Sequence, residues 1–182
     1  MIRAIETAYN GYLFRSRLEA RWAVFLDALG IRYEYEPQGF VLPSGRYLPD
    51  FRLRGWDDAR GAPSNLWVEI KGEEPTDRER RLAQELADEG AATVYLFAGS
   101  IAIPPREGPN QALGFFPGGS AFGFRWVACP RCGRRGIIRT RVPYCPHCPE
   151  SVPSPAAEQL IEAYLAARTA RFEFGYTGRP PV

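Results

Sequence analysis

The sequence predicts a fold of the α/β or α+β class, in which a mixed β-sheet is flanked by helices. Three observations support this prediction. Two segments with helical periodicity, residues 14–30 and 75–90, alternate along the chain with apolar, β-rich segments at residues 66–71 and 92–98. The third observation is that all four cysteines lie in one short C-terminal segment, which predicts a small metal-binding unit beside the sheet.

The N-terminal part is expected to form one helix and three short strands. Residues 14–30 have an apolar side chain every three or four positions before Gly30, namely Leu18, Trp22, Phe25, Leu26 and Leu29. Residues 31–37 alternate between polar and apolar side chains, as in a half-buried strand. Residues 39–53 are expected to form two short strands around a Pro-Ser-Gly turn.

The middle of the chain is expected to complete the sheet. Residues 66–71 are apolar and β-rich, which predicts a central strand. A second helix over residues 75–90 and a buried strand over residues 92–98 follow. Residues 99–123 are rich in Gly and Pro, and we expect a long, irregular and partly buried connection there.

The sequence predicts three units: a sheet-containing core over residues 1–122, a cysteine unit over residues 123–150, and a helix with a tail over residues 151–182. The last helix is expected at residues 155–170. Ser154 is a suitable N-cap for it because the hydroxyl can accept a hydrogen bond from the first turn.

Composition excludes several classes of protein. The chain has 182 residues and a net charge of +2, so its overall charge does not indicate a nucleic-acid-binding protein. Charged residues interrupt the N-terminal segment, which is unlike a signal peptide, and no apolar stretch is long enough to span a membrane. We therefore expect a cytoplasmic protein without a membrane partner. The clustered cysteines are also unlike a disulfide framework spread through a secreted domain.

Lys71 is the single lysine of the chain. The sequence has 23 Lys and Arg residues, so the other 22 are arginines. Such a bias follows from a GC-rich genome where the two cations are interchangeable. A lysine is required where a compact, mobile charge that can lose its proton is needed, and chance retention is the alternative.

Two acidic residues are expected near Lys71. Glu69 and Lys71 are two positions apart, so in a strand both side chains point to one face. Asp50 stands at the start of a preceding short strand and can meet Glu69 if the two strands pair. Two carboxylates and a backbone carbonyl are oxygen ligands of the kind that Mg²⁺ binds, and a lysine beside the metal can hold an attacking water.

These motifs resemble the PD-(D/E)XK nuclease superfamily, through Pro49-Asp50 followed by Glu69-Ile70-Lys71. Glu19 stands where many members carry an acidic residue in the helix before the core sheet, and the resemblance covers residues 12–97. It implies a restriction-endonuclease-like sheet flanked by helices and metal-dependent cleavage of a phosphodiester. Asp50, Glu69 and the Ile70 carbonyl would bind Mg²⁺ or Mn²⁺, Lys71 would be the base or water-positioning group, and Glu19 an accessory acid.

Each of these residues has an alternative interpretation. Ser16 and Glu19 have the spacing of a capping box, so Glu19 could serve the start of the first helix. Asp50 follows a proline and could be a turn residue. Glu69 and Lys71 could form an ion pair on an edge strand. A Gln-x-x-x-Tyr motif, used by some branches of the superfamily, is not found after Lys71, and Gln84 is a weak counterpart.

The cysteine segment has the pattern of a zinc ribbon. Two Cys-x-x-Cys knuckles, separated by twelve residues, can bind one Zn²⁺ through Cys129, Cys132, Cys145 and Cys148. An iron–sulfur cluster is the main alternative, although its cysteines are usually unevenly spaced. His147 lies between two ligands and could replace Cys148, but four cysteines are sufficient.

Residues 125–141 contain six arginines and no acidic residue, so the cysteine unit is locally basic. Arginine suits phosphate contacts, and we expect nucleic-acid binding by Arg131, Arg134, Arg135, Arg139 and Arg141. The alternatives are that arginine is only the local polar residue, or that the ribbon packs on the core.

The function expected from the sequence is that of a Mg²⁺- or Mn²⁺-dependent nuclease acting on nucleic acid, above all DNA, with Zn²⁺ as a structural ion. The alternative is a nuclease-fold module that binds nucleic acid or protein in a larger complex without cleaving. An accessory factor of transcription or replication would leave Lys71 unexplained. A homodimer or a larger complex is compatible with either function.

Overall fold

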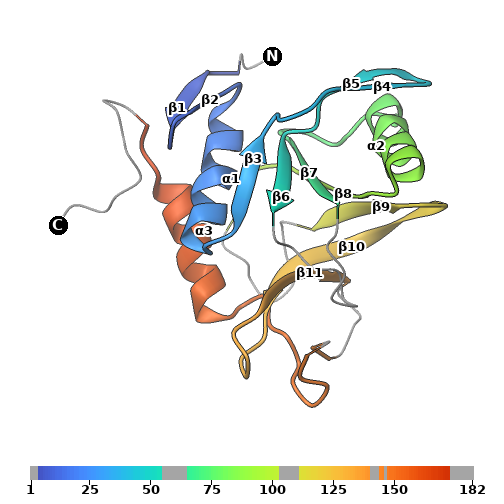
Figure 1. Cartoon of the computed structure of the whole chain (residues 1–182). Coiled ribbons are helices and arrows are strands. Elements are labelled where there is room, and N and C mark those ends of the chain that lie inside the picture. The colour runs from blue at the N-terminus through green and yellow to red at the C-terminus, as the bar shows by residue number, and fades with distance from the viewer. Residues whose placement is uncertain (1–3, 55–64, 103–110, 140–143, 146, 173–182) are drawn as a thin grey trace.

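The computed structural model describes residues 4–54, 65–102, 111–139, 144–145 and 147–172, with residue 122 described through its backbone alone. Figure 1 shows the whole chain. The described residues form three helices and eleven strands, in the order β1 (Thr7–Tyr9), β2 (Tyr12–Phe14), α1 (Arg17–Ala28), β3 (Arg32–Tyr35), β4 (Phe40–Leu42), β5 (Gly45–Tyr47), β6 (Phe51–Arg54), β7 (Leu66–Lys71), α2 (Asp77–Gly90), β8 (Thr93–Ala98), β9 (Ala112–Phe116), β10 (Gly119–Ala128), β11 (Arg135–Arg139) and α3 (Glu158–Thr169).

The main sheet has seven strands in the order β11-β10-β9-β8-β7-β6-β3. The β7–β8 pair is parallel and is connected through α2, whereas the other neighbouring pairs are antiparallel. The sequence prediction of a mixed α+β sheet is therefore confirmed, and residues 66–71 have a hydrogen-bonded strand on each side. Short hairpins β1–β2 and β4–β5 lie outside this sheet.

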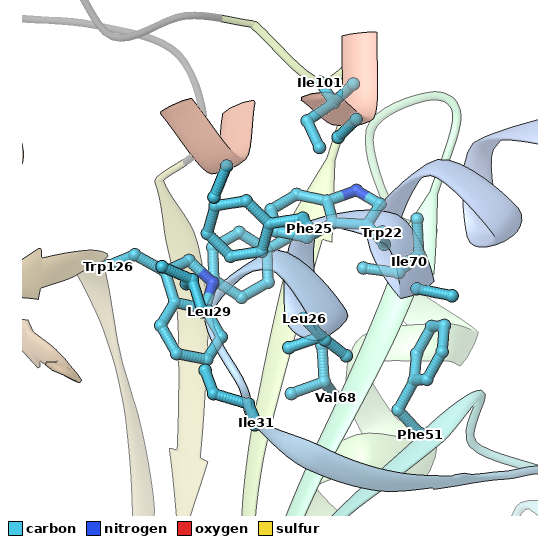
Figure 2. Close-up of a cluster of buried hydrophobic side chains, with 14 of the residues drawn as sticks. Trp22, Phe25, Leu26, Leu29, Ile31, Phe51, Val68, Ile70, Ile101 and Trp126 are labelled. Carbon is cyan, nitrogen blue, oxygen red and sulfur yellow. The ribbon is translucent and has the colours of Figure 1, made fainter. Parts of the chain in front are cut away.

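Helices cover both faces of the sheet (Figure 1). The face under α1 and α3 holds the larger apolar core, in which Val68 and Ile70 of β7 are buried. Figure 2 shows part of this core, with its labelled residues Trp22, Phe25, Leu26, Leu29, Ile31, Phe51, Val68, Ile70, Ile101 and Trp126. The other face packs Trp67 of β7 against α2 and the β4–β5 hairpin. The alternation of β7 thus directs Glu69 and Lys71 to the α2 side of the sheet.

The helix ends follow ordinary capping chemistry. The Ser16 hydroxyl caps α1 by accepting from the Glu19 N–H, and Thr76 with Glu79 forms a full capping box on α2. The start of α3 differs from the expectation. Its N-cap is Ala157, because the backbone of Ser154 is instead paired with that of Ala128 at the end of β10.

The expected irregular connection at residues 99–123 is wrong for the part of it that the structure describes beyond residue 110. That part contains β9 and the beginning of β10, which form a hairpin on the main sheet. Gly118 turns the chain with a φ of 83°, a conformation that favours glycine. Gly114 is required by packing, since a Cβ there would lie 2.9 Å from the ring of Phe124. The glycines that suggested a loop therefore serve a tight turn and a crowded strand.

The cysteine unit is continuous with the sheet. The expected boundary between residues 122 and 123 falls inside β10, which pairs with β9 on one side and β11 on the other. Arg135 at the start of β11 donates from Nη1 to the carbonyl of Leu29 at 2.5 Å, so it satisfies a free carbonyl at the C-terminus of α1. The sheet edge near the cysteines is thereby attached to the first helix.

Among the helices that the structure describes, none is long and apolar enough to cross a lipid bilayer.

Candidate functional site

Asp50 and Glu69 are brought together by the pairing of β6 with β7. Phe51 is opposite Val68 in this antiparallel pair, so continuing the register places Asp50 opposite Glu69. The Asp50 N–H donates to Glu69 Oε2 at 3.3 Å, and the Ile70 N–H donates to Asp50 Oδ2 at 2.7 Å. Each acidic residue is only 2% exposed. Asp50 lies in a bend directly before β6, as the turn alternative expects, but its side chain is buried.

The two carboxylates are buried at an electrostatic cost. Burial, followed by the charges of Glu69 and Glu19, raises the pKa of Asp50 well above its usual value. Burial also raises the pKa of Glu69, although Lys71 partly offsets the effect. Two adjacent acids in a low-dielectric environment favour a bound proton or a bound cation. The pair therefore has the charge properties of a cation-binding site.

The Lys71 ammonium group lies between two acids. Its Nζ is 2.7 Å from Glu69 Oε1 and 3.0 Å from Glu79 Oε1, and its side chain is 28% exposed. Burial alone would lower the pKa of Lys71, but the two carboxylates outweigh burial and raise it. Lys71 is consequently protonated at neutral pH in this state. Sequence analysis did not single out Glu79, although its capping-box spacing with Thr76 could have indicated that its side chain is held in place.

Glu19 occupies a neighbouring position, and both of its oxygens are engaged. Oε1 accepts from the Ser16 hydroxyl at 2.6 Å, while Oε2 accepts from the Tyr35 hydroxyl at 2.6 Å and from the Arg15 N–H at 3.1 Å. Glu19 is thus part of the network that organises the start of α1. Its charge still acts on Asp50, as the raised pKa of Asp50 shows.

Sequence reasoning missed Arg15, which forms an ion pair with Asp50 in the part of the chain that the structure describes. Its Nη2 lies 3.0 Å from Asp50 Oδ1, and its Nε pairs with Glu36. Arg15 directly precedes the N-cap of α1, whereas Asp50 directly precedes β6. No local pattern links two positions 35 residues apart, so their contact depends on the tertiary fold.

The site can offer hard oxygen ligands to a small cation. Asp50 and Glu69 supply two carboxylates. In a strand the N–H and C=O groups of one residue face the same neighbour, so the Ile70 carbonyl faces the side on which its N–H meets Asp50. These three groups are chemically suited to Mg²⁺ or Mn²⁺, which bind oxygen and retain waters.

The four cysteines form a second cluster, which could hold a metal such as zinc. The Sγ atoms of Cys129, Cys132, Cys145 and Cys148 all lie within 4.8 Å of one another. Those of Cys132 and Cys145 are 3.9 Å apart, too far for a disulfide. Tetrahedral Zn²⁺ with Zn–S distances of about 2.3 Å requires sulfurs about 3.8 Å apart. The spacing of the cluster fits this requirement.

Contacts around Cys129 favour its thiolate, the form that binds metal. The hydroxyl of Ser151 lies 3.3 Å from its Sγ, and this contact, together with backbone N–H groups of Arg131 and Cys132, lowers the pKa of Cys129 to about 6. His147, the possible substitute for Cys148, has its Nε2 at 3.4 Å from Arg134, in keeping with four cysteines being sufficient. Ser151 was not found from the sequence, because it lies outside the knuckles.

The arginines of the cysteine unit do not share one role. Arg131 pairs with Glu150 at 2.9 Å, and Arg135 is bonded to Leu29 of the core. Arg134 lies beside His147, and Arg139 is exposed at the end of β11. Arg141 lies outside the described residues. Arg134 and Arg139 are therefore the better placed of the expected nucleic-acid contacts.

Gln84, the weak counterpart of the Gln-x-x-x-Tyr motif, forms hydrogen bonds that connect two parts of the fold. Its amide donates to the Phe116 carbonyl at 2.8 Å and to Asp88 at 3.0 Å. Gln84 thus joins α2 to the β9–β10 hairpin.

Comparisons of the chain with protein-family models, with curated proteins and with solved structures found no match. The function is therefore inferred from the chemistry of the acidic site around Asp50 and Glu69 and of the four-cysteine cluster.

We predict that the protein purified without added metal contains about one zinc per chain, since one tetrahedral site needs four thiolates. Cys132→Ser should lose the metal and disorder the cysteine unit, because the binding energy of such sites is largely folding energy. His147→Ala is the matched control and should keep the metal. Elemental analysis measures both, and iron with a visible absorption band would contradict the assignment to zinc.

The raised pKa of Asp50 predicts a cost to the metal-free fold. The folded state binds a proton on Asp50 more tightly than the unfolded chain does, so ionised Asp50 destabilises the fold at neutral pH. Asp50→Asn, which keeps an acceptor for the Ile70 N–H, should raise the Tm in EDTA at neutral pH. About 1 kcal/mol corresponds to about 2–4 °C for a chain of this size.

The advantage of Asp50→Asn should shrink as the pH falls through the folded-state pKa, because wild-type Asp50 then takes up a proton. Thermal unfolding in EDTA over a pH series measures it. A lower Tm for the variant at neutral pH would show that the neighbouring cation compensates the buried charge fully.

Proposed function

We propose that this protein is a divalent-metal-dependent nuclease of the PD-(D/E)XK type, acting on DNA. The observation that carries the proposal is the convergence of two buried carboxylates and a lysine on one face of β6 and β7. Asp50 and Glu69 meet through the 3.3 Å hydrogen bond, and Lys71 is bound to Glu69 at 2.7 Å. Burying two carboxylates beside each other destabilises the fold, so such an arrangement indicates a functional site rather than a stabilising one.

The order of elements supports a restriction-endonuclease-like core within the sheet. The chain runs through α1, then β3, β6 and β7 as an antiparallel set, then α2, and returns as β8 parallel to β7. The site lies where β6 begins, on the face covered by α2. The motif resemblance implies a core sheet flanked by helices over residues 12–97, and this order of elements is compatible with it.

Asp50, Glu69 and the Ile70 carbonyl would hold Mg²⁺ or Mn²⁺. When bound, such an ion polarises a phosphoryl oxygen and makes a bound water easier to ionise. The chain's own contribution is a rigid pair of carboxylates: the Ile70 N–H fixes Asp50, and both neighbours of Glu69 on β7 are buried in the sheet. Rigid placement of this kind lowers the barrier by orienting the reacting groups.

Lys71 is best suited to hold the attacking water and to offset developing negative charge. Its pKa is raised by Glu69 and Glu79, which favours a protonated donor over a free base. Glu79 gives the ammonium group a second carboxylate contact, at 3.0 Å, beside that of Glu69. The reaction adds one water across one phosphodiester bond: the water oxygen bonds to phosphorus, the ester P–O bond breaks, and the leaving oxygen ends as a hydroxyl.

The four-cysteine unit would bind zinc as a structural ion and present arginines to the DNA backbone. Arg135 and the Ala128–Ser154 backbone pair attach this unit to the core, so its orientation is set by the sheet. Arg134 and Arg139 remain on its surface for phosphate contacts.

The decisive test is metal-dependent cleavage of labelled DNA. Wild type should cleave with Mg²⁺ or Mn²⁺ and be inactive in EDTA, while Asp50→Ala and Glu69→Ala should lose cleavage and remain folded. Lys71→Arg should bind DNA in Ca²⁺ but cleave at least about 10²-fold more slowly, since a planar guanidinium cannot replace a compact ammonium between two acids. Arg54→Gln, which removes an exposed ion pair on β6, is the control and should cleave normally.

Single-turnover cleavage rates, measured together with DNA binding, distinguish a nuclease from a binding module that does not cleave. Wild-type rates in Lys71→Arg would remove Lys71 from the mechanism. DNA binding without cleavage under any divalent metal would favour the nuclease-fold binding module, and neither binding nor cleavage would favour a protein-binding role.

The two surface arginines of the cysteine unit should contribute to affinity through phosphate contacts. We expect Arg134→Gln combined with Arg139→Gln to weaken DNA binding and to reduce the slope of log affinity against log salt by about 1 per lost contact. Arg168→Gln on α3 is the control. Fluorescence anisotropy over a salt series measures the slope, and an unchanged slope would place the DNA away from this unit.

A further inference from the structure

Arg15 holds an unusual position for a half-exposed arginine. Its side chain is 54% exposed, yet its Nη2 contacts Asp50, whose side chain is 3% exposed, at 3.0 Å. The Arg54–Glu34 pair on the neighbouring strands shows the ordinary alternative, with side chains 46% and 37% exposed. Arg15 therefore extends from the surface into the buried acidic pair, which a surface ion pair does not do.

The backbone of Arg15 is fixed, whereas its guanidinium is held by side chains, namely the carboxylates of Asp50 and Glu36 and the hydroxyl of Tyr35. The Arg15 N–H donates to Glu19 Oε2 at 3.1 Å and to the Tyr35 hydroxyl at 3.0 Å. The guanidinium is shared between Asp50 and Glu36. This combination allows the side chain to change partner while its origin stays in place.

In the described structure each carboxylate of the Asp50–Glu69 pair has its own cation. Lys71 pairs with Glu69, and Arg15 pairs with Asp50. A divalent ion on Asp50 would stand within a few ångströms of the guanidinium, and like charges at such distances repel strongly where water is partly excluded. The guanidinium must then leave Asp50 or have an anion placed between it and the ion.

We propose that Arg15 is the counter-ion of Asp50 in the metal-free protein, leaves that carboxylate when a divalent ion binds, and then contacts a phosphate of the bound DNA. The guanidinium is suited to this exchange, because its fork of N–H donors matches carboxylate and phosphate geometry equally. Glu36 keeps the released side chain at the edge of the site. The inference rests on the proposed function for its substrate, but its first step concerns metal binding alone.

Two binding measurements test the exchange without relying on cleavage. In calorimetry without DNA, Arg15→Gln should bind Mn²⁺ about fivefold more tightly than wild type, the effect of removing a competing, partly exposed ion pair. In anisotropy with a short labelled DNA duplex, the same variant should lose at least about tenfold affinity in Ca²⁺ and less than about twofold in EDTA, because the phosphate contact forms only after displacement. Arg54→Gln should change none of these values.

Arg15→Lys provides a second variant that keeps the charge and protects against misfolding of Arg15→Gln. It should bind Mn²⁺ as wild type does, since a cation still competes, and should lose part of the Ca²⁺-dependent DNA affinity, since the fork is gone. Thermal unfolding confirms that the variants are folded.

Three results would overturn the proposal. Weaker Mn²⁺ binding in Arg15→Gln would make Arg15 a residue that orients Asp50 for the ion. An equal loss of DNA affinity in EDTA and in Ca²⁺ would show that Arg15 contacts DNA without displacement, and no loss in Ca²⁺ would exclude the phosphate contact. If the wild type binds Mn²⁺ and DNA but never cleaves DNA, the proposed nuclease activity is wrong. The binding measurements on the Arg15 variants would still test the role of Arg15.

Discussion

The burial of two carboxylates side by side is the constraint on which the rest of the site depends. Asp50 and Glu69 are almost completely covered, and a strand pair brings them together. Isolated negative charges in such surroundings are costly, so the fold surrounds them with a backbone N–H from Ile70 and with two cations from different elements. The apolar packing of β7 supplies the rigidity that keeps the acids from separating.

The parts of the site that share a local pattern could be predicted from the sequence. The period-two alternation of β7 places Glu69 and Lys71 on one face, and the knuckle spacing brings four cysteines together. The meeting of Asp50 with Glu69 required only that two adjacent strands pair. Arg15 could not be found in this way, since it reaches the site from the start of α1.

The errors in the predicted fold have a common physical origin. Glycine and proline usually indicate loops, but Gly114 is in β9 because an aromatic ring occupies the space of its side chain, and Gly118 makes a tight turn. Ser154 has the chemistry of an N-cap but is used as a backbone partner of β10. At Gly114 and Ser154 contacts with distant parts of the chain determined the conformation, and a single sequence carries no record of that packing.

The packing of α3 on α1 has a consequence for the order in which the chain acquires structure. The ring of Phe25 lies 4.4 Å from that of Tyr164, and the C-terminus of α1 is capped by a residue 106 positions later in the chain. Contacts of such separation slow folding, since a long loop must close before they form. During synthesis the part of α1 that Tyr164 covers therefore stays exposed until residues 158–169 have been made, so α1 acquires its last packing partner late.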